Sequence, residues 1–181
     1  MNPLKIIDKY YDKHSKAYSY LTTHSKMVAN KAIKISMQLE NLKLNIRFIE
    51  EASMLHNIGI FLTNAPEIGC NGEKPYVAHG YLGRELLEKE GYPEHALVCE
   101  RHVGVGISKD EIIKNNLPLP KRDMSPITLE EQIICFADKF FSKTKLPLTH
   151  ERSVEEVKNK LEKYGKDKVE KFEYWLDLFY S

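Results

Sequence analysis

The chain has 181 residues, a formal net charge of +1, and 42% hydrophobic and 29% charged residues. A chain of this length buries about two-thirds of the surface that its unfolded form exposes, so a single core needs no disulfide bonds. Charges of both signs are spread along it, which excludes a basic stripe for long nucleic acid, and no stretch approaches the roughly 18 apolar residues of a membrane span.

Apolar residues recur every three to four positions, and period-two runs of β-branched residues do not occur, so the sequence predicts an all-α fold. In chain order, we expect helices over residues 4–11, 23–39, 46–58, 77–89 and 93–103, and a long buried helix in LEEQIICFADKFFSK. The stretches TNAPEIGCNGEKPY and NNLPLPKRDMSP are rich in glycine or proline and are expected loops.

Capping-box spacing marks the starts of two helices. Thr128 and Glu131 stand three residues apart before the long buried helix, and Ser153 and Glu156 repeat the pattern before a polar tail. We therefore expect the last part of the chain to be helical as well.

The three cysteines are an odd number and include no CxxC pair. Such thiols are expected to be reduced, and the amino terminus lacks the apolar run of a signal peptide. We expect a soluble, cytoplasmic protein, and the sequence leaves its oligomeric state open.

Polar side chains interrupt the apolar faces of five predicted helices. His24 shares a helix face with Val28, and Asp138 follows Ile134 by one turn. The other three are His56, His79 and His102. One such histidine alone is more often a hydrogen-bonded core residue, but a buried carboxylate needs a partner, and five polar residues facing one core favour a shared cation.

The remaining histidines, His14, His95 and His150, are assigned to the surface. His95 lies two turns before His102, so a position lining the cavity stays open for it. The loop residues Lys121 and Arg122 are either solvated charges or, over a metal site, ligands for phosphate oxygens.

The order of His24, HNIG at residues 56–59, His79, His102 and Asp138 resembles the HD superfamily of metal-dependent phosphohydrolases, in its HDIG branch. The resemblance covers about residues 20–145. It implies a helical bundle around a mono- or dinuclear divalent-metal centre that hydrolyses phosphate esters, often of nucleotides. We therefore expect a single helical domain over residues 1–181, with an HD-like core over about 20–145 and a helical extension over about 153–179.

The resemblance also implies that His24, His56 and Asp138 are the principal metal ligands, and that His79 and His102 hold a second metal in dinuclear members. Asn57 stands where the family has an aspartate. A carboxylate can bridge two cations, whereas an amide offers one neutral oxygen, so we expect one metal rather than two. We expect Asn57 to be a ligand too, and Asn57 and Asp138 to be the catalytic residues.

The nitrogen-rich ligand set suits Fe, Mn, Ni, Co or Zn better than Mg or Ca. Our leading hypothesis is a phosphohydrolase for a small phosphorylated metabolite or nucleotide, in which Lys121 and Arg122 receive phosphate and Glu67–Tyr76 forms a lid. The alternative is a catalytically weakened or silent protein that binds metal and nucleotide as a sensor. A helical scaffold with internally satisfied histidines ranks last, because its buried polar groups would be costly.

Overall fold

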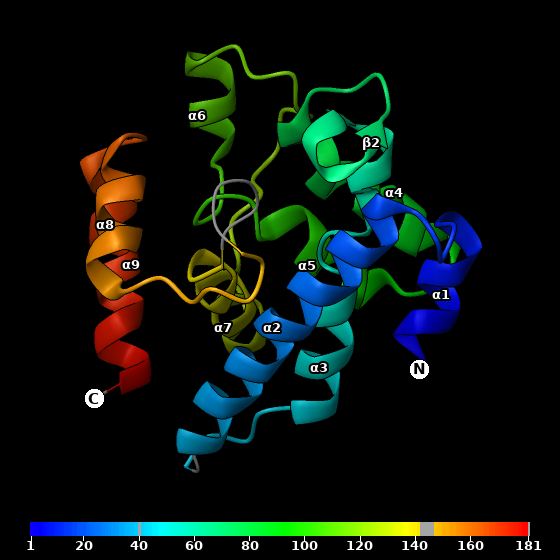
Figure 1. Ribbon diagram of the computed structural model, residues 1–181. Coiled ribbons are helices and arrows are strands. Elements are labelled where there is room, and N and C mark those ends of the chain that lie inside the picture. Colours follow the sequence, from blue (N-terminus) through cyan, green and yellow to red (C-terminus); the bar gives the residue numbers. More distant parts are fainter. Residues whose placement is uncertain (40, 142–146, 181) are drawn as a thin grey trace.

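The computed structural model describes residues 1–39, 41–141 and 147–180 (Figure 1). Its α-helices are α1 (Pro3–Tyr10), α2 (Lys16–Gln38), α3 (Ile46–Leu55), α4 (His79–Lys89), α5 (Pro93–Arg101), α6 (Lys109–Lys114), α7 (Leu129–Lys139), α8 (Val154–Glu162) and α9 (Lys166–Tyr180). Short 3-10 helices are η1 (Ile58–Leu62), η2 (Pro66–Ile68) and η3 (Tyr76–Ala78). The all-α prediction is confirmed.

The long helix α2 packs against α3 and α7 (Figure 1). On the side away from α8 and α9, α4 packs against α5 and η1. The core between α2, α3 and α7 contains fully buried side chains such as Val28, Ile49 and Ile133. These packed helices hold the polar residues of the site at fixed positions.

Most helices begin where a side-chain oxygen caps a free backbone N–H. Ser15 accepts from the N–H of Tyr18, so α2 starts at Lys16 and not near residue 23 as predicted. The capping box of Ser153 and Glu156 is confirmed. The second expected box, of Thr128 and Glu131, is only half formed within the described chain. The Thr128 hydroxyl accepts from the N–H of Glu131, but the Glu131 carboxylate accepts from the N–H of Ile127 and not from that of Thr128.

Four further parts of the chain differ from the prediction. The helix expected over 46–58 ends at Leu55, and the expected long helix of the last third ends at Lys139. The short helix α6 was not predicted, although Ser108 caps it. The loop TNAPEIGCNGEKPY contains two antiparallel strands of two residues each, β1 (Asn64–Ala65) and β2 (Cys70–Asn71).

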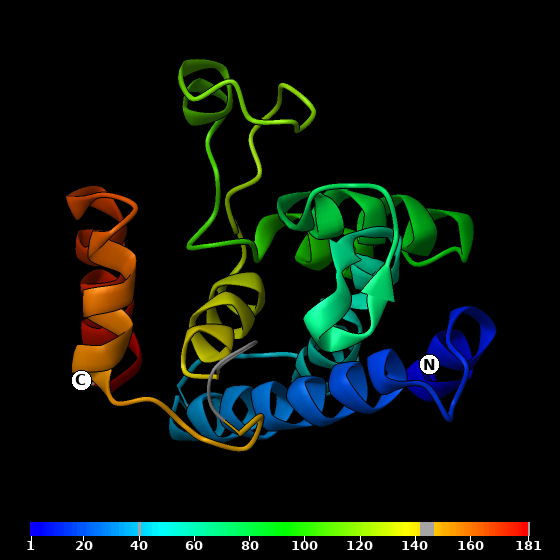
Figure 2. The same ribbon diagram turned by 45° about the horizontal axis from the view of Figure 1, so that its top comes forward.

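The polar tail is a hairpin of two helices, α8 and α9, that stands beside α7 (Figure 2). Phe172, Trp175 and Phe179 of α9 are buried, and the rings of Phe172 and Phe179 lie 4.9 and 5.4 Å from that of Phe136 in α7. The indole N–H of Trp175 donates to Gln132 at 3.1 Å. The hairpin is thus part of the same hydrophobic core as α2 and α7.

In the part of the chain that the structure describes, none of the helices combines the length and apolar character needed to span a bilayer.

Candidate metal centre and adjoining pocket

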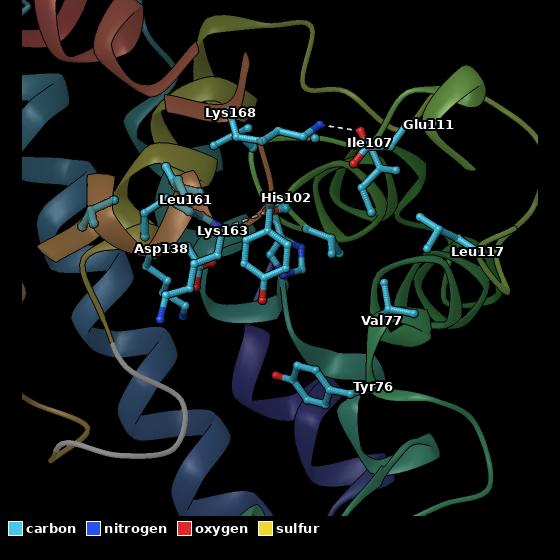
Figure 3. A pocket seen from close by; sticks show the side chains of 18 of the residues that line it. Tyr76, Val77, His102, Ile107, Glu111, Leu117, Asp138, Leu161, Lys163 and Lys168 are labelled. Atoms are coloured by element: carbon cyan, nitrogen blue, oxygen red, sulfur yellow. Dashed lines mark hydrogen bonds and ion pairs between the residues drawn. The ribbon is translucent and has the colours of Figure 1, made fainter. Parts of the chain in front are cut away.

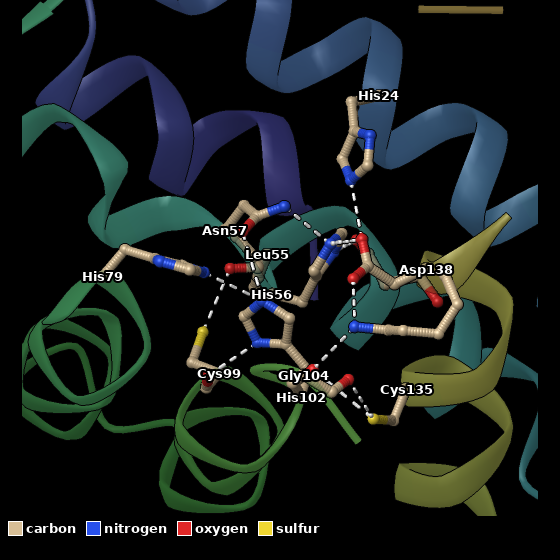
Figure 4. Close-up of polar contacts among 12 residues, drawn as sticks. His24, Leu55, His56, Asn57, His79, Cys99, His102, Gly104, Cys135 and Asp138 are labelled. Atoms are coloured by element: carbon tan, nitrogen blue, oxygen red, sulfur yellow. Dashed lines mark hydrogen bonds and ion pairs between the residues drawn. The ribbon is translucent and has the colours of Figure 1, made fainter. Parts of the chain in front are cut away.

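Three buried residues, held by three different helices or their ends, meet at one point. His24 lies in the middle of α2, His56 directly follows α3, and Asp138 lies in the last turn of α7. The Asp138 Oδ1 atom is 2.9 Å from His24 Nε2 and 3.3 Å from His56 Nε2 (Figure 4). One ligand atom from each residue lies within 4.8 Å of the other two, so this group can hold a metal ion.

Backbone carbonyls fix the orientation of three of the histidine rings. His56 Nδ1 lies 2.6 Å from the carbonyl oxygen of Ser53, three residues earlier in the chain. His79 and His102 repeat the arrangement, with Nδ1 at 2.6 and 2.7 Å from the carbonyls of Tyr76 and Cys99. A carbonyl only accepts, so each Nδ1 carries the proton, and each Nε2 turns its lone pair inward, as a metal ligand requires.

These inward nitrogens lie close to other acceptors. His79 Nε2 is 3.1 Å from His102 Nε2, and His56 Nε2 is 3.3 Å from the Asp138 carboxylate. Two acceptors at such distances repel each other unless a proton or a cation lies between them. The donor set therefore fits a bound cation.

The Asn57 side chain bridges two of the histidines. Its Nδ2 lies 2.7 Å from His56 Nε2, and its Oδ1 lies 3.2 Å from His102 Nε2. Asn57 is 1% exposed, so the amide is enclosed by the same residues that the cation would contact. The structure thus brings together all six residues that the sequence assigned to the metal centre.

Gly59 explains how the end of α3 approaches α4. A Cβ atom at Gly59 would lie 2.4 Å from the carbonyl oxygen of His79 and 2.5 Å from the backbone nitrogen of Gly83. Only a residue without a side chain permits this contact between η1 and α4. The contact places His56 and His79 on facing elements of one site.

Lys139 lies at the same centre, although the sequence analysis gave it no functional role. Its Nζ is 2.8 Å from Asp138 Oδ2 and 3.2 Å from the His102 carbonyl oxygen. Asp138 therefore faces the two histidines with one oxygen and a lysine with the other. The ammonium offsets part of the carboxylate charge and holds its orientation.

A pocket of about 570 Å³ opens beside the centre. His79, His102 and Asp138 line it on one side (Figure 3). Its other walls come from Tyr76, from residues 103–107 with α6, and from the α8–α9 hairpin. This volume is typical of a site for a small molecule.

Two tyrosines, the buried Tyr20 and the partly buried Tyr76, lie next to the histidines. Tyr20 stacks on His24 with ring centroids 6.1 Å apart, and Tyr76 lies 4.7 Å from His79. Burial raises the pKa of both phenols well above the ordinary value, and the charge of Asp138 adds to this effect. Both hydroxyls therefore stay protonated and can donate hydrogen bonds.

The loop residues Lys121 and Arg122 do not line this pocket. Both are exposed, and the Arg122 guanidinium is paired with the buried Glu100 carboxylate, which Arg84 also contacts. The structure gives no support to their predicted role as phosphate ligands. The lysines that do line the pocket include Lys139 and three of the α8–α9 hairpin.

The predicted surface position of His95 is wrong. The residue is 8% exposed and packs edge-on against Phe48, with ring centroids 4.8 Å apart. It lies on the face of α5 that meets α3, not in the cavity. His14 and His150 are exposed, as predicted.

The expected lid over Glu67–Tyr76 is packed against the body of the protein. Ile68 and Cys70 are buried in a core shared with α1 and α2, and a Cβ on Gly69 would meet the backbone of Ala17 at 2.9 Å. These contacts argue against an opening segment. Only Tyr76, at its end, lines the pocket.

Comparison with known proteins identifies a family and several relatives. The HD domain family matches residues 21–142. An uncharacterized protein of Methanocaldococcus jannaschii is 34% identical over 125 residues, which are 67% of this chain and 66% of that protein. No solved structure gives a significant match.

Two proteins named tRNA (cytidine(56)-2'-O)-methyltransferase, from Thermoplasma volcanium and Picrophilus torridus, are 28% and 31% identical over 70% and 60% of this chain. The matched segments cover only 33% and 29% of those two proteins, so this chain spans about a third of their length. The family match covers every residue of the histidine cluster, from His24 to Asp138. The chain therefore belongs to the HD domain family.

Proposed function

We propose that the protein is a metal-dependent phosphohydrolase that acts on a small phosphate ester or nucleotide. The observation that supports it best is the meeting of His24, His56 and Asp138 at the side of a pocket of about 570 Å³. Membership of the HD domain family supports a metal-dependent hydrolase in the same way. The pocket size favours a small molecule over long nucleic acid.

In this proposal, His24, His56 and Asp138 hold the cation. When bound, a divalent metal polarises a phosphoryl oxygen and makes a water molecule a better nucleophile at neutral pH. The Asp138 carboxylate keeps its orientation through Lys139, whose ammonium lies 2.8 Å from Oδ2. Lys139 also lines the pocket, so its charge can attract the phosphate of a substrate.

The Asn57 amide supports one metal rather than two. Turned by 180°, it would direct Oδ1 toward the metal at His56 and let Nδ2 donate to the lone pair of His102 Nε2. That arrangement is compatible with the protonation of His56 and His102, in which Nδ1 carries the proton toward a backbone carbonyl and Nε2 keeps its lone pair. It also occupies the lone pair through which His102 would bind a second cation.

The nitrogen-rich donor set favours a transition metal, among Fe, Mn, Ni, Co and Zn. The second candidate function is a catalytically weakened or silent sensor that binds metal and nucleotide. Asn57 favours it, since an amide contributes no negative charge to the centre and cannot bridge two cations.

The test combines metal analysis with an activity screen. We expect the purified protein to contain up to one equivalent of a transition metal and to hydrolyse members of a phosphate-ester panel once the metal is supplied. His56→Ala should lose the metal and the activity, whereas His14→Ala, a change at an exposed histidine, should keep both. Absence of metal after growth in supplemented medium would refute the proposal. Full metal content without hydrolysis would favour the sensor.

A further inference from the structure

The pocket has a wall that lies outside the matched family domain. The domain match ends at residue 142, whereas α8 and α9 span 154–180. Residues from α8, from the turn that follows it and from the start of α9 line the pocket: Val157, Lys160, Leu161, Lys163, Tyr164 and Lys168. Half of them are lysines.

The lysines of this wall sit near the metal centre and across from α6. Figure 3 shows Lys163 and Lys168 on the hairpin side of the pocket. His102 and Asp138 line the same pocket. Lys168 Nζ reaches Glu111 of α6 across the pocket. Within the described residues, Lys163 makes no ion pair, and its side chain is exposed.

Basic residues near the end of a helix also interact with its dipole, so their sequence position alone proves nothing. The opposite wall makes the arrangement informative, because Val77, Ile107 and Leu117 make most of it apolar, and its one carboxylate, Glu111, is already paired with Lys168 (Figure 3). The pocket is thus cationic along the hairpin, largely apolar on the facing wall, and polar at the histidines. A ligand that complements all three surfaces has an apolar or aromatic body and more than one anionic group.

We propose that Lys160, Lys163 and Lys168 of the hairpin form a second anion subsite, and that the substrate carries a second phosphate besides the one at the metal centre. The position of the first phosphate, at the metal centre, rests on the proposed function. The position of the second phosphate rests on the hairpin lysines alone. On binding, Lys168 exchanges the Glu111 carboxylate for the phosphate. The hairpin selects substrates by charge, while the family domain performs the chemistry.

The first experiment compares two hydrolysis probes, ADP and p-nitrophenyl phosphate, which carry two phosphates and one. The Lys160→Gln/Lys163→Gln double variant should raise KM for ADP by about tenfold and change KM for p-nitrophenyl phosphate by less than about twofold. Metal content and melting temperature should stay unchanged. Lys166→Gln is the matched control, because Lys166 is an exposed lysine of the same hairpin that does not line the pocket.

The single variant Lys163→Arg keeps the positive charge but changes the shape of the side chain. It should therefore bind ADP much more tightly than the double variant does. If Lys163 had only a structural role, keeping its charge would not preserve the ADP affinity. Equal loss for both probes, or no loss for ADP, would overturn the second subsite.

The second experiment separates this inference from the proposed function. Calorimetric titration of ADP into chelator-treated protein measures binding without hydrolysis. The protein should bind ADP more tightly than AMP, and the double variant should lose this preference. If no phosphate ester is hydrolysed but the preference depends on Lys160 and Lys163, the proposed function fails and the subsite stands. If esters are hydrolysed and the double variant binds ADP as the unmodified protein does, the subsite fails alone.

Discussion

Replacing Asn57 by aspartate should make the stability of the protein strongly dependent on metal. The side chain at position 57 lies 2.7 Å from His56 Nε2, which lies 3.3 Å from Asp138 Oδ1. The new carboxylate would therefore stand within about 6 Å of Asp138, and two unit charges at that distance repel by about 3 kcal/mol at an effective dielectric constant of about 20. Both residues are buried, so solvent offers little relief.

In metal-free protein at neutral pH, this repulsion should lower the melting temperature of Asn57→Asp by roughly 6–12 °C, as expected for a chain of this size. With a divalent cation, the same carboxylate becomes an attractive ligand. Added metal should therefore raise the melting temperature more in the variant than in the unmodified protein. We also expect hydrolysis to rise by about tenfold, equivalent to about 1.4 kcal/mol in barrier height.

Thermal denaturation with chelator and with added Mn²⁺, together with initial rates on a phosphate-ester panel, measures both effects. Asn57→Ala serves as the control, since it removes the amide without adding charge. If Asn57→Asp and Asn57→Ala respond equally to metal, position 57 does not face a cation. If the aspartate variant gains metal affinity but stays inert, the sensor becomes the better explanation.

Three further predictions concern stability. Arg122→Ala should lower the free energy of unfolding by about 1–2 kcal/mol, measured in urea, because the buried Glu100 carboxylate loses one of its guanidinium partners, without change in catalysis. Gly59→Ala should cost about 1–3 kcal/mol and reduce metal content, because the new Cβ would lie 2.4 Å from the His79 carbonyl oxygen. Burial lowers the pKa of His95 in the folded protein, so near and below pH about 6.5 the unfolded chain binds more protons at this residue than the folded chain does. The free energy of unfolding should therefore fall as the pH drops below about 6.5. His95→Gln should remove this dependence in thermal scans at several pH values.

The controls are chosen from exposed residues. Lys121→Ala should leave unfolding in urea unchanged, and His150→Gln should keep the acid sensitivity of the unmodified protein. Equal destabilisation by Lys121→Ala and Arg122→Ala would contradict the role of the Glu100 ion pair. Acid sensitivity that persists in His95→Gln would assign the effect to other groups. A Gly59→Ala variant with normal metal content would show that η1 and α4 can separate without disturbing the site.

That the polar residues of the metal centre face one core could be predicted from the sequence because periodicity sets which face of a helix a residue occupies, whereas their roles as metal ligands were expected from the resemblance to the HD superfamily. His24, His79 and Asp138 each interrupt an apolar stripe, and stripes face the core, where they meet. Lys139 could not be found this way. Adjacent residues on a helix do not face each other, so its contact with Asp138 Oδ2 depends on how the lysine stem bends back.

The pocket was harder to predict because its walls come from tertiary contacts. The position of α9 depends on aromatic side chains that fill a space beside Phe136, which no local pattern reveals. Arg122 resembled a phosphate ligand in the loop, but the buried Glu100 competes for it. The position of His95 was mispredicted for the same reason. It shares a helix face with His102, but His95 packs against Phe48 of α3, whereas His102 packs against His79 of α4.

The docking of α9 onto α7 also sets the order in which the protein can fold during synthesis. Asp138 leaves the ribosome well before Phe172, Trp175 and Phe179, yet the rings of Phe172 and Phe179 cover much of the aromatic face of α7 that begins at Phe136. A nascent chain that ends at residue 142 would therefore expose this face to water, in a segment that already contains all the histidines of the cluster. Stable capture of metal should follow translation of residues 166–180, and a chain truncated at the end of the family domain should aggregate rather than form a smaller enzyme.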